Sequence, residues 1–219
     1  MKVALFFAAP IGNLQDITLR AIEVLKSVDL IACEDTRHTS ILLKHYGINA
    51  PTTSFFQHNR FTKGEYILGL LKAGKQVALV SDAGTPGILD PGYNLVNLAI
   101  ANGIEITFIP GPTAFVNALV LSGKPAHEFF FAGFLTNRKI ARRNQLVKLC
   151  ALGKTVVFYE SCHRILPALE DIGFVLKDKP IAVCRELTKK FEEVLRGPAA
   201  EIAAKLAKNK PRGEFVVVI

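Results

Sequence analysis

Short apolar runs alternate with amphipathic segments along this chain of 219 residues. Residues 3–9 are almost all hydrophobic and are followed by Pro10 and Gly12, a pattern that predicts a buried strand closed by a turn. Apolar residues then recur at helical spacing over 17–28, with Asp16 available as the N-cap. We expect further strands at 30–33, 52–56, 76–80 and 105–109, separated by helices at 38–46, 62–73 and 91–102. This βαβ alternation predicts a mainly parallel sheet with helices on both faces.

A second series of strands and helices follows Pro110-Gly111-Pro112. We expect a helix to about residue 121, and the turn-forming Ser122-Gly123-Lys124-Pro125 after it is typical of a boundary. Beyond it we expect strands at 129–131, 155–159, 181–184 and 215–219, with helices at 140–149, 163–172 and 198–208. The sequence therefore predicts two α/β domains, residues 1–113 and 114–219.

Loops rich in Gly, Pro and charged residues follow the predicted strands, at the ends where ligands bind in open α/β sheets. The stretch 81–92 holds three Gly, two Pro and two Asp, which fixes its conformation and lets the backbone approach a ligand. We favour a binding loop over a plain turn here, although neither GxGxxG nor a GK[ST] ending is present. Together these loops indicate a cleft between two domains, and they lie at 10–13, 34–39, 81–87, 110–114 and 160–164.

Composition narrows the class of protein. The 27 Lys and Arg outnumber the 19 Asp and Glu, for a net charge of +8. Such a charge is typical of proteins with an anionic partner such as nucleic acid, but by itself it fits a role in solubility about equally well. The four Cys are scattered without a CxxC pair, so we expect neither a metal site nor a disulfide framework. No apolar run reaches the roughly 18 residues of a membrane span, and residues 2–9 are too short for a signal peptide. We expect a soluble cytoplasmic protein.

Nine ordered motifs run along nearly the whole chain: Pro10-Ile11-Gly12-Asn13-Leu14, Glu34-Asp35-Thr36-Arg37, Val80-Ser81-Asp82-Ala83-Gly84-Thr85-Pro86-Gly87, Asp90-Pro91-Gly92, Pro110-Gly111-Pro112, Phe158-Tyr159-Glu160-Ser161, His163-Arg164, Cys184-Arg185-Glu186-Leu187-Thr188 and Gly213-Glu214-Phe215. In this order they resemble the tetrapyrrole-methylase-fold enzymes. The likeness is strongest to the branch that 2′-O-methylates a cytidine of small-subunit ribosomal RNA. Ala9, Lys124, Thr136 and Cys162 depart from this branch, and many members continue beyond the position of Ile219, so we expect the usual C-terminal extension to be lacking.

The resemblance implies a two-domain α/β fold with S-adenosylmethionine in the inter-domain cleft, and a homodimer. Backbone groups of Gly-rich loops can bond the adenine and the amino-acid end of that cofactor, while apolar side chains enclose the ring. Asp82 is the strongest single candidate, although Asp also caps loops through local hydrogen bonds. The cofactor residues that the resemblance implies are Pro10, Asp82, Ala83, Gly84, Thr113, Ala114, Tyr159, Leu187 and Gly213.

A ribose hydroxyl is a weak nucleophile, so a base next to it would assist methyl transfer. Glu34, Asp35 and Glu160 are the candidates, and positioning alone could also suffice. Glu34 could equally form a structural pair with Arg37 or Arg164, because ion-pair networks also occupy clefts.

Basic side chains are candidates for holding RNA phosphates. Arg37, His38, Arg60 and Arg164 could do so at the cleft rim. The predicted helix at 140–149 presents either a basic face to RNA or a solvated surface, with Ile140, Val147 and Cys150 expected to face inward. Its basic residues, with those just before it, are Arg138, Lys139, Arg142, Arg143 and Lys148.

Two other functions remain open at this stage. A methyltransferase acting on a tetrapyrrole would share the fold, but the Glu34-Asp35-Thr36-Arg37 motif and the net charge of +8 favour ribosomal RNA or the small ribosomal subunit as the partner. A non-catalytic RNA-binding module on the same fold would bind S-adenosylmethionine poorly, and calorimetry would distinguish it.

Overall fold

The chain forms two compact units, Met1–Thr113 and Ala114–Ile219, in a computed structural model that describes residues 3–90 and 92–219. Pro91, which the sequence places at the start of a helix, lies outside the described residues. Each unit has its own sheet and its own hydrophobic core. Among the residues described, no helix is long and apolar enough to cross a bilayer.

The first unit contains a five-stranded sheet in the order β3-β2-β4-β1-β5, in which every neighbouring pair is parallel. Phe7, at the end of β1, lies opposite Val80 of β4 and Ile109 of β5. The parallel sheet predicted from the sequence is confirmed. Its strands are β1 (Val3–Phe7), β2 (Leu30–Cys33), β3 (Thr52–Ser54), β4 (Val77–Val80) and β5 (Glu105–Ile109).

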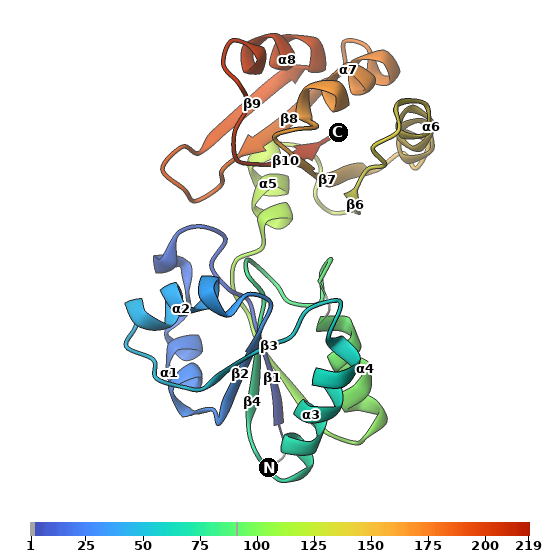
Figure 1. Ribbon diagram of the computed structural model, residues 1–219. Coiled ribbons are helices and arrows are strands. Elements are labelled where there is room, and N and C mark those ends of the chain that lie inside the picture. The colour runs from blue at the N-terminus through green and yellow to red at the C-terminus, as the bar shows by residue number, and fades with distance from the viewer. Residues whose placement is uncertain (1–2, 91) are drawn as a thin grey trace. The chain divides into compact units, whose positions relative to one another are not determined.

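Helices cover both faces of this sheet (Figure 1). Leu25 of α1 and Leu43 of α2 pack with one set of strand residues, and Leu71 of α3 and Leu95 of α4 pack with the alternate set. This alternation is the period of two expected for strands buried on both sides. The elements are η1 (Leu14–Asp16), α1 (Leu19–Ser27), α2 (Thr36–His45), α3 (Arg60–Lys72) and α4 (Gly92–Ala101).

The start of α1 differs from the sequence prediction. Asp16 does not cap this helix, because a 3₁₀ turn first uses Asn13 as its own cap and ends at Asp16. The Thr18 hydroxyl then accepts the Ala21 amide at 3.2 Å and begins α1 two residues later. The prediction of Asp16 as the N-cap is therefore wrong, and Thr18, which the sequence analysis did not single out, is the N-cap.

The second unit contains a mixed sheet in the order β6-β7-β10-β8-β9. β6 and β7 are parallel, whereas the pairs β7–β10, β10–β8 and β8–β9 are antiparallel. The sequence reasoning missed β9, whose Glu, Arg, Gly and Pro residues give no apolar run. The strands are β6 (Phe129–Phe134), β7 (Thr155–Ser161), β8 (Pro180–Arg185), β9 (Glu193–Pro198) and β10 (Glu214–Val218).

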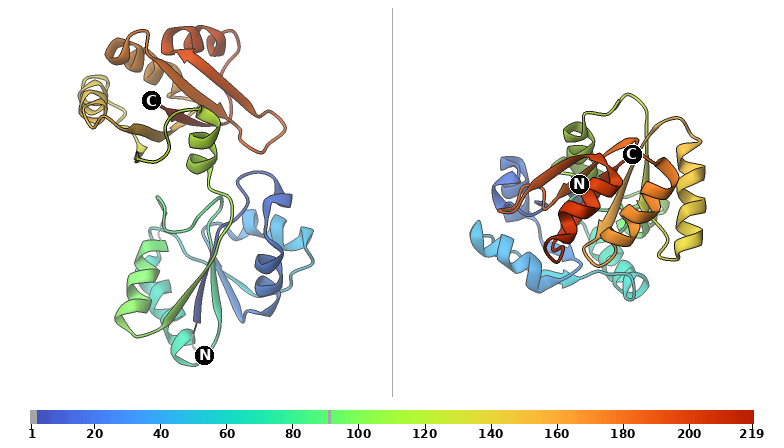
Figure 2. Two further views of the ribbon diagram at one scale, coloured as in Figure 1. Left: turned by 180° about the vertical axis from the view of Figure 1, so that it is seen from behind. Right: turned by 90° about the horizontal axis from the view of Figure 1, so that it is seen from above.

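Three helices pack on one face of this second sheet and one on the other (Figure 2). Val183 belongs to the core beneath α6, α7 and α8, whereas its neighbour Cys184 faces α5 and lies 4.0 Å from the Ala118 carbonyl. The α/β class expected for this half is therefore confirmed. The helices are α5 (Ala114–Ser122), α6 (Lys139–Cys150), α7 (Ile165–Leu176) and α8 (Ala199–Ala207).

Candidate functional site

The loops at the carboxyl edge of the first sheet are tied to one another. The Ala9 amide donates to the Gly84 carbonyl at 2.8 Å, and the Gly84 amide donates to the Ala9 carbonyl at 3.0 Å. Asp82 Oδ1 accepts the Asp35 amide at 3.1 Å. The loops that follow β1, β2 and β4 are therefore held as one rigid edge.

Hydroxyl groups fix the same edge from within. Ser81 is buried, and its hydroxyl donates to the Gly84 carbonyl at 2.8 Å. The hydroxyls of Thr85 and Thr113 lie 2.6 Å apart and join the loop after β4 to the segment after β5. Three predicted cofactor residues, Asp82, Gly84 and Thr113, thus lie in one hydrogen-bonded set.

Two carboxyl groups at this edge have raised pKa values. Burial, together with the charges of Asp90 and then Asp82, raises the pKa of Glu34 to about 7. Burial also raises the pKa of Asp90, although its Oδ1 accepts the Gly87 amide at 2.6 Å and the Gly92 amide at 2.7 Å. Glu34 therefore changes charge near neutral pH, as a general base requires.

Asp35 has the opposite electrostatic environment. Arg37 contacts it with Nε at 3.1 Å and with a second guanidinium nitrogen at 2.7 Å, and these bonds hold the pKa of Asp35 well below its usual range. Asp35 also N-caps α2 by accepting the Arg37 amide at 2.8 Å. A carboxylate with so low a pKa is a weak base, so the geometry favours Glu34 over Asp35 for proton transfer.

A cavity of about 300 Å³ lies against this edge. Its size is at the lower end of the range of about 300–1,000 Å³ typical of small-molecule sites. Most of its wall is apolar, with the Asp82 carboxyl and His38 as the ionisable groups. The lining residues are Ala9, Pro10, Gly12, Leu14, His38, Thr39, Ile41, Leu42, Val80, Ser81 and Asp82.

Glu160 of the second unit is buried in a structural pair. It is 2% exposed, accepts the Ser161 amide at 2.9 Å, and lies 3.2 Å from Arg164 Nε. Arg164 also donates to the Leu135 carbonyl at 2.5 Å. Burial raises the pKa of Glu160, against the effects of Ser161 and Arg164. Within the second unit Arg164 therefore pairs with Glu160, and within the first unit Arg37 pairs with Asp35 rather than with Glu34.

Three candidate cofactor residues of the second unit lie at one sheet edge. Tyr159 is near the end of β7, Leu187 follows β8, and Gly213 precedes the antiparallel strand β10 that separates them. A Cβ at Gly213, where φ is +89°, would lie 2.4 Å from Glu186 Cγ. Any larger residue at Gly213 would therefore have to displace the Glu186 side chain, next to Leu187.

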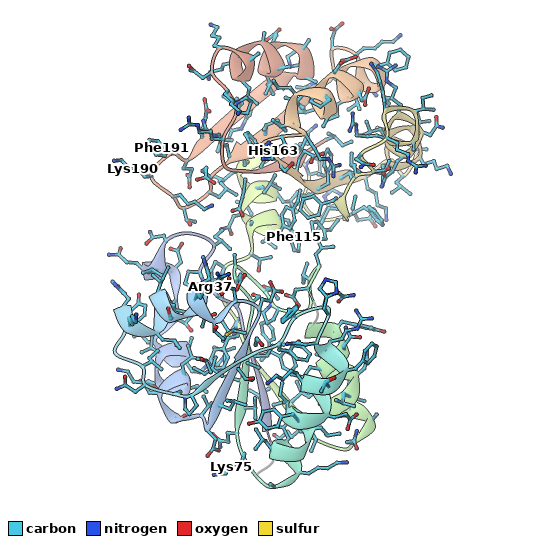
Figure 3. All side chains as sticks on the ribbon, in the orientation of Figure 1. Arg37, Lys75, Phe115, His163, Lys190 and Phe191 are labelled. Carbon is cyan, nitrogen blue, oxygen red and sulfur yellow. The ribbon has the colours of Figure 1, made fainter. Side chains whose placement is uncertain are left out.

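The basic residues predicted to contact RNA differ in exposure. The Arg37 side chain, in the first turn of α2, is 90% exposed (Figure 3). His38 and Arg138 are exposed, and Arg60 is half-buried, with its guanidinium 4.8 Å from the centre of the Phe61 ring. Contact of these four residues with RNA stays a prediction.

Arg142 requires a correction. It is 3% exposed, and its Nε donates to Asp171 of α7 at 2.8 Å, so the prediction that it contacts RNA is wrong. Arg143 bonds the other Asp171 oxygen at 2.6 Å and lies over the Phe174 ring at 3.8 Å. Asp171 is fully buried and needs cations beside it, so α6 turns this side inward.

The apolar residues of α6 were consequently misplaced. Ile140 is 76% exposed and Val147 55% exposed, and Cys150 is exposed as well, although all three were expected to face inward. Asp171 carried a usable signal in the sequence, because a lone Asp amid apolar helix positions requires a buried partner. Asp90, whose charge raises the pKa of Glu34, stands in the Asp90-Pro91-Gly92 motif but was not among the predicted site residues.

The sequence comparisons decide the family. The profile of the Tetrapyrrole (Corrin/Porphyrin) Methylases matches residues 5–203. The chain belongs to this family. Its relatives include proteins named ribosomal RNA small subunit methyltransferase I, so the resemblance stated from the motifs is confirmed and the family is one of methyltransferases.

Three of these relatives show the extent of the match. The protein of Escherichia coli O157:H7 is 47% identical over 96% of this chain and 74% of its own length. That of Thermotoga maritima is 45% identical over 100% of this chain and 98% of its own length. That of Bacillus subtilis is 43% identical over 100% of this chain and 75% of its own length.

Solved structures share the fold. Uroporphyrin-III C-methyltransferase of Thermus thermophilus has a TM-score of 0.68 at 19% identity, covering 100% of this chain and 94% of its own. A cobalt precorrin-4 methyltransferase has a TM-score of 0.72 at 17% identity, covering 99% and 93%. Diphthine synthase has a TM-score of 0.75 at 14% identity, covering 99% and 89%. At such identities the likeness establishes the fold alone, and it confirms the predicted fold class.

Proposed function

We propose that this chain is an S-adenosylmethionine-dependent methyltransferase that methylates the 2′-oxygen of a cytidine ribose in small-subunit ribosomal RNA. The observation that carries this proposal is the identity of 43–47% along nearly the whole chain with proteins named for small-subunit ribosomal RNA methylation. The structural neighbours that act on tetrapyrroles are below 20% identical and support the fold only.

The described residues fit the proposed cofactor. Asp82 uses Oδ1 for the Asp35 amide, and its other carboxyl oxygen can accept a donor from the ligand. Tyr159, which is half-buried, is proposed to pack against the adenine ring. The residues proposed to hold the cofactor are Pro10, Asp82, Ala83, Gly84 and Thr113 of the first unit and Ala114, Tyr159, Leu187 and Gly213 of the second.

The chain's own contribution to the reaction is alignment and proton removal. When bound, the cofactor supplies a methyl group on a sulfonium, whose thioether is a good leaving group. Glu34 accepts the proton of the 2′-hydroxyl as the oxygen–carbon bond forms, and it then returns this proton to solvent. Burial, together with the charges of Asp90 and Asp82, raises the pKa of Glu34 to about 7, so that about half of the Glu34 carboxyl is ionised, and able to accept a proton, at neutral pH. Arg37, exposed three residues after Glu34 in the chain, holds a phosphate of the RNA.

The proposal extends to partners and location. Ribosomal RNA or the small ribosomal subunit is the macromolecular partner, and a second copy of the chain completes a homodimer in the cytoplasm. The excess of 27 Lys and Arg over 19 Asp and Glu supports an anionic partner.

Methyl incorporation from labelled S-adenosylmethionine tests the proposal. Unmodified small ribosomal subunits, free small-subunit RNA and a reduced tetrapyrrole are offered to the protein in parallel. We expect label in RNA or subunits only, and loss of that label in Glu34→Gln. Label in the tetrapyrrole instead would contradict the proposal. Failure to bind S-adenosylmethionine in calorimetry would point to a non-catalytic RNA-binding module.

A further inference from the structure

Aromatic rings gather on one face of the second sheet, at its β6 edge. Phe115, at the start of α5 (Figure 3), stacks on Phe131 with ring centres 4.3 Å apart. Phe131 and Phe134 each meet the Tyr159 ring edge-on, at 5.1 and 5.7 Å, and Phe129 lies 6.3 Å from Phe115. Five rings thus form one connected cluster.

A β-bulge places Phe134 in this cluster. Strand alternation puts Phe131 on one face and Ala132 on the other, where Ala132 packs against the core under α6, α7 and α8. Regular alternation would send Phe134 to the same side as Ala132. The register shifts between Phe131 and Phe134, with Gly133 at φ +65°, and Phe134 then pairs opposite Tyr159. Bulges of this kind commonly re-aim a side chain at a functional site.

Two of the rings remain open to solvent. Phe129 is 41% exposed and Phe134 is 51% exposed, and both lie on the edge strand of the sheet. On this face α5 packs against β7, β8, β9 and β10, whereas the part of the face formed by β6 carries the aromatic rings. Exposed apolar rings on an edge strand promote aggregation, and exposed apolar patches of this kind typically mark a binding site.

An exposed basic residue follows the rings in the chain. Arg164 donates to the carbonyl of Leu135, the residue after Phe134, but its charge is paired with Glu160, whereas Arg138, the N-cap of α6, is exposed four residues after Phe134. Single-stranded RNA is bound by this combination, because bases stack on aromatic side chains while Arg takes the adjacent phosphate. A purely apolar partner would leave Arg138 without a role.

We propose that Phe129 and Phe134 form a stacking platform for nucleobases of single-stranded RNA, with Tyr159 and Phe131 as the rings that hold the platform in place and Arg138 as the phosphate contact. This inference rests on the proposed function, because it names the surface by which the methyltransferase takes its RNA. It assigns to β6 a part in substrate binding that is separate from cofactor binding.

The test compares Phe129→Ala and Phe134→Ala with the wild-type chain. Phe134→Tyr retains a ring, and Phe174→Ala removes a more exposed ring elsewhere in the same unit, at 65% exposure. Affinity for a fluorescein-labelled oligocytidine RNA is measured by anisotropy, and affinity for S-adenosylmethionine by calorimetry. Each alanine variant should bind the RNA roughly 5- to 100-fold more weakly, as for loss of one stacked base. Phe134→Tyr and Phe174→Ala should bind the RNA as wild type does, and the cofactor affinity of Phe129→Ala, whose ring packs on Phe115 and not on Tyr159, should stay close to wild type.

An RNA of the same length with abasic sites separates stacking from phosphate contact. Wild type and Phe134→Ala should bind it equally, because the base that the ring contacts is gone. An unchanged affinity of both alanine variants for the intact RNA would overturn the inference, and so would an equal loss of cofactor affinity in Phe129→Ala. A shift from dimer to monomer in sedimentation would assign the rings to a subunit contact instead. If the wild-type chain binds no RNA and methylates none, the proposed function fails as well; if it does both and the variants match it, only the platform fails.

Discussion

Removing the charge of Asp90 should shift the pH dependence of methyl transfer. Glu34 has a pKa of about 7, raised by burial and then by the charges of Asp90 and Asp82. Asp90→Asn deletes one of those charges while its Oδ1 still accepts the Gly87 and Gly92 amides. The carboxylate of Glu34 then forms at lower pH, so the midpoint of the rate profile should move to lower pH.

The size of the effect follows from the ionised fraction of Glu34. With a pKa of about 7, about a tenth of Glu34 is ionised near pH 6 and about nine tenths near pH 8. The wild-type kcat/KM should therefore rise about tenfold across this interval, because kcat/KM follows the free enzyme's base. An ordinary glutamate, with a pKa of about 4.3, would give a flat profile over the same range.

The assay is initial-rate transfer of labelled methyl to unmodified small subunits across this pH range. Asp29→Asn is the matched control: Asp29 precedes β2 at the opposite edge of the sheet and pairs with Lys75 at 2.9 Å. It should leave the midpoint unchanged. A flat wild-type profile, or the same midpoint in Asp90→Asn as in wild type, would refute Glu34 as the base.

Three further changes test separate parts of the account. Asp82→Ala should weaken S-adenosylmethionine binding in calorimetry while lowering the ligand-free stability by only about 1 kcal/mol, the typical effect of one lost hydrogen bond; a much larger loss in urea unfolding would make Asp82 structural. Asp171→Asn should lower the free energy of unfolding by roughly 3–5 kcal/mol, because it leaves the buried Arg142 without its counter-ion; a loss below about 1 kcal/mol would contradict that pairing. Arg37→Gln should flatten the dependence of log RNA affinity on log salt by about 0.7, as for one phosphate contact on a single strand, and an unchanged slope would remove Arg37 from the RNA surface.

Much of the fold was predictable because strand and helix periods are explicit in the first unit. The apolar runs at β2 and β4 are buried at every position, as in parallel sheets covered on both faces. β9 was missed because an edge strand of charged and small residues has no such signature. The inward face of α6 was assigned wrongly because Ile140 and Val147 dominate its apolar pattern, whereas Asp171, on another helix, determines which side is buried.

The candidate site, like the fold, was predictable from the sequence only in part. The loop positions of Asp82 and Glu34 followed from the strand order, because ligand loops gather at carboxyl edges of parallel strands. The sequence could not show which of the three candidate bases has a pKa suited to proton transfer, because the pKa depends on contacts that form only in the folded chain. Asp35 is held by Arg37, and Glu160 is buried with Arg164, which leaves Glu34 as the group with a pKa near neutrality.

Identification of the methylated nucleoside tests most directly whether the chain methylates the 2′-oxygen of a cytidine in small-subunit ribosomal RNA, as we propose. Unmodified small subunits are incubated with the protein and labelled S-adenosylmethionine, the RNA is digested to nucleosides, and the labelled nucleoside is identified by mass spectrometry. The account predicts label in 2′-O-methylcytidine alone, at a single position in the RNA sequence, and none with Glu34→Gln. Label on a base, or on no nucleoside at all while S-adenosylmethionine binds, would contradict it.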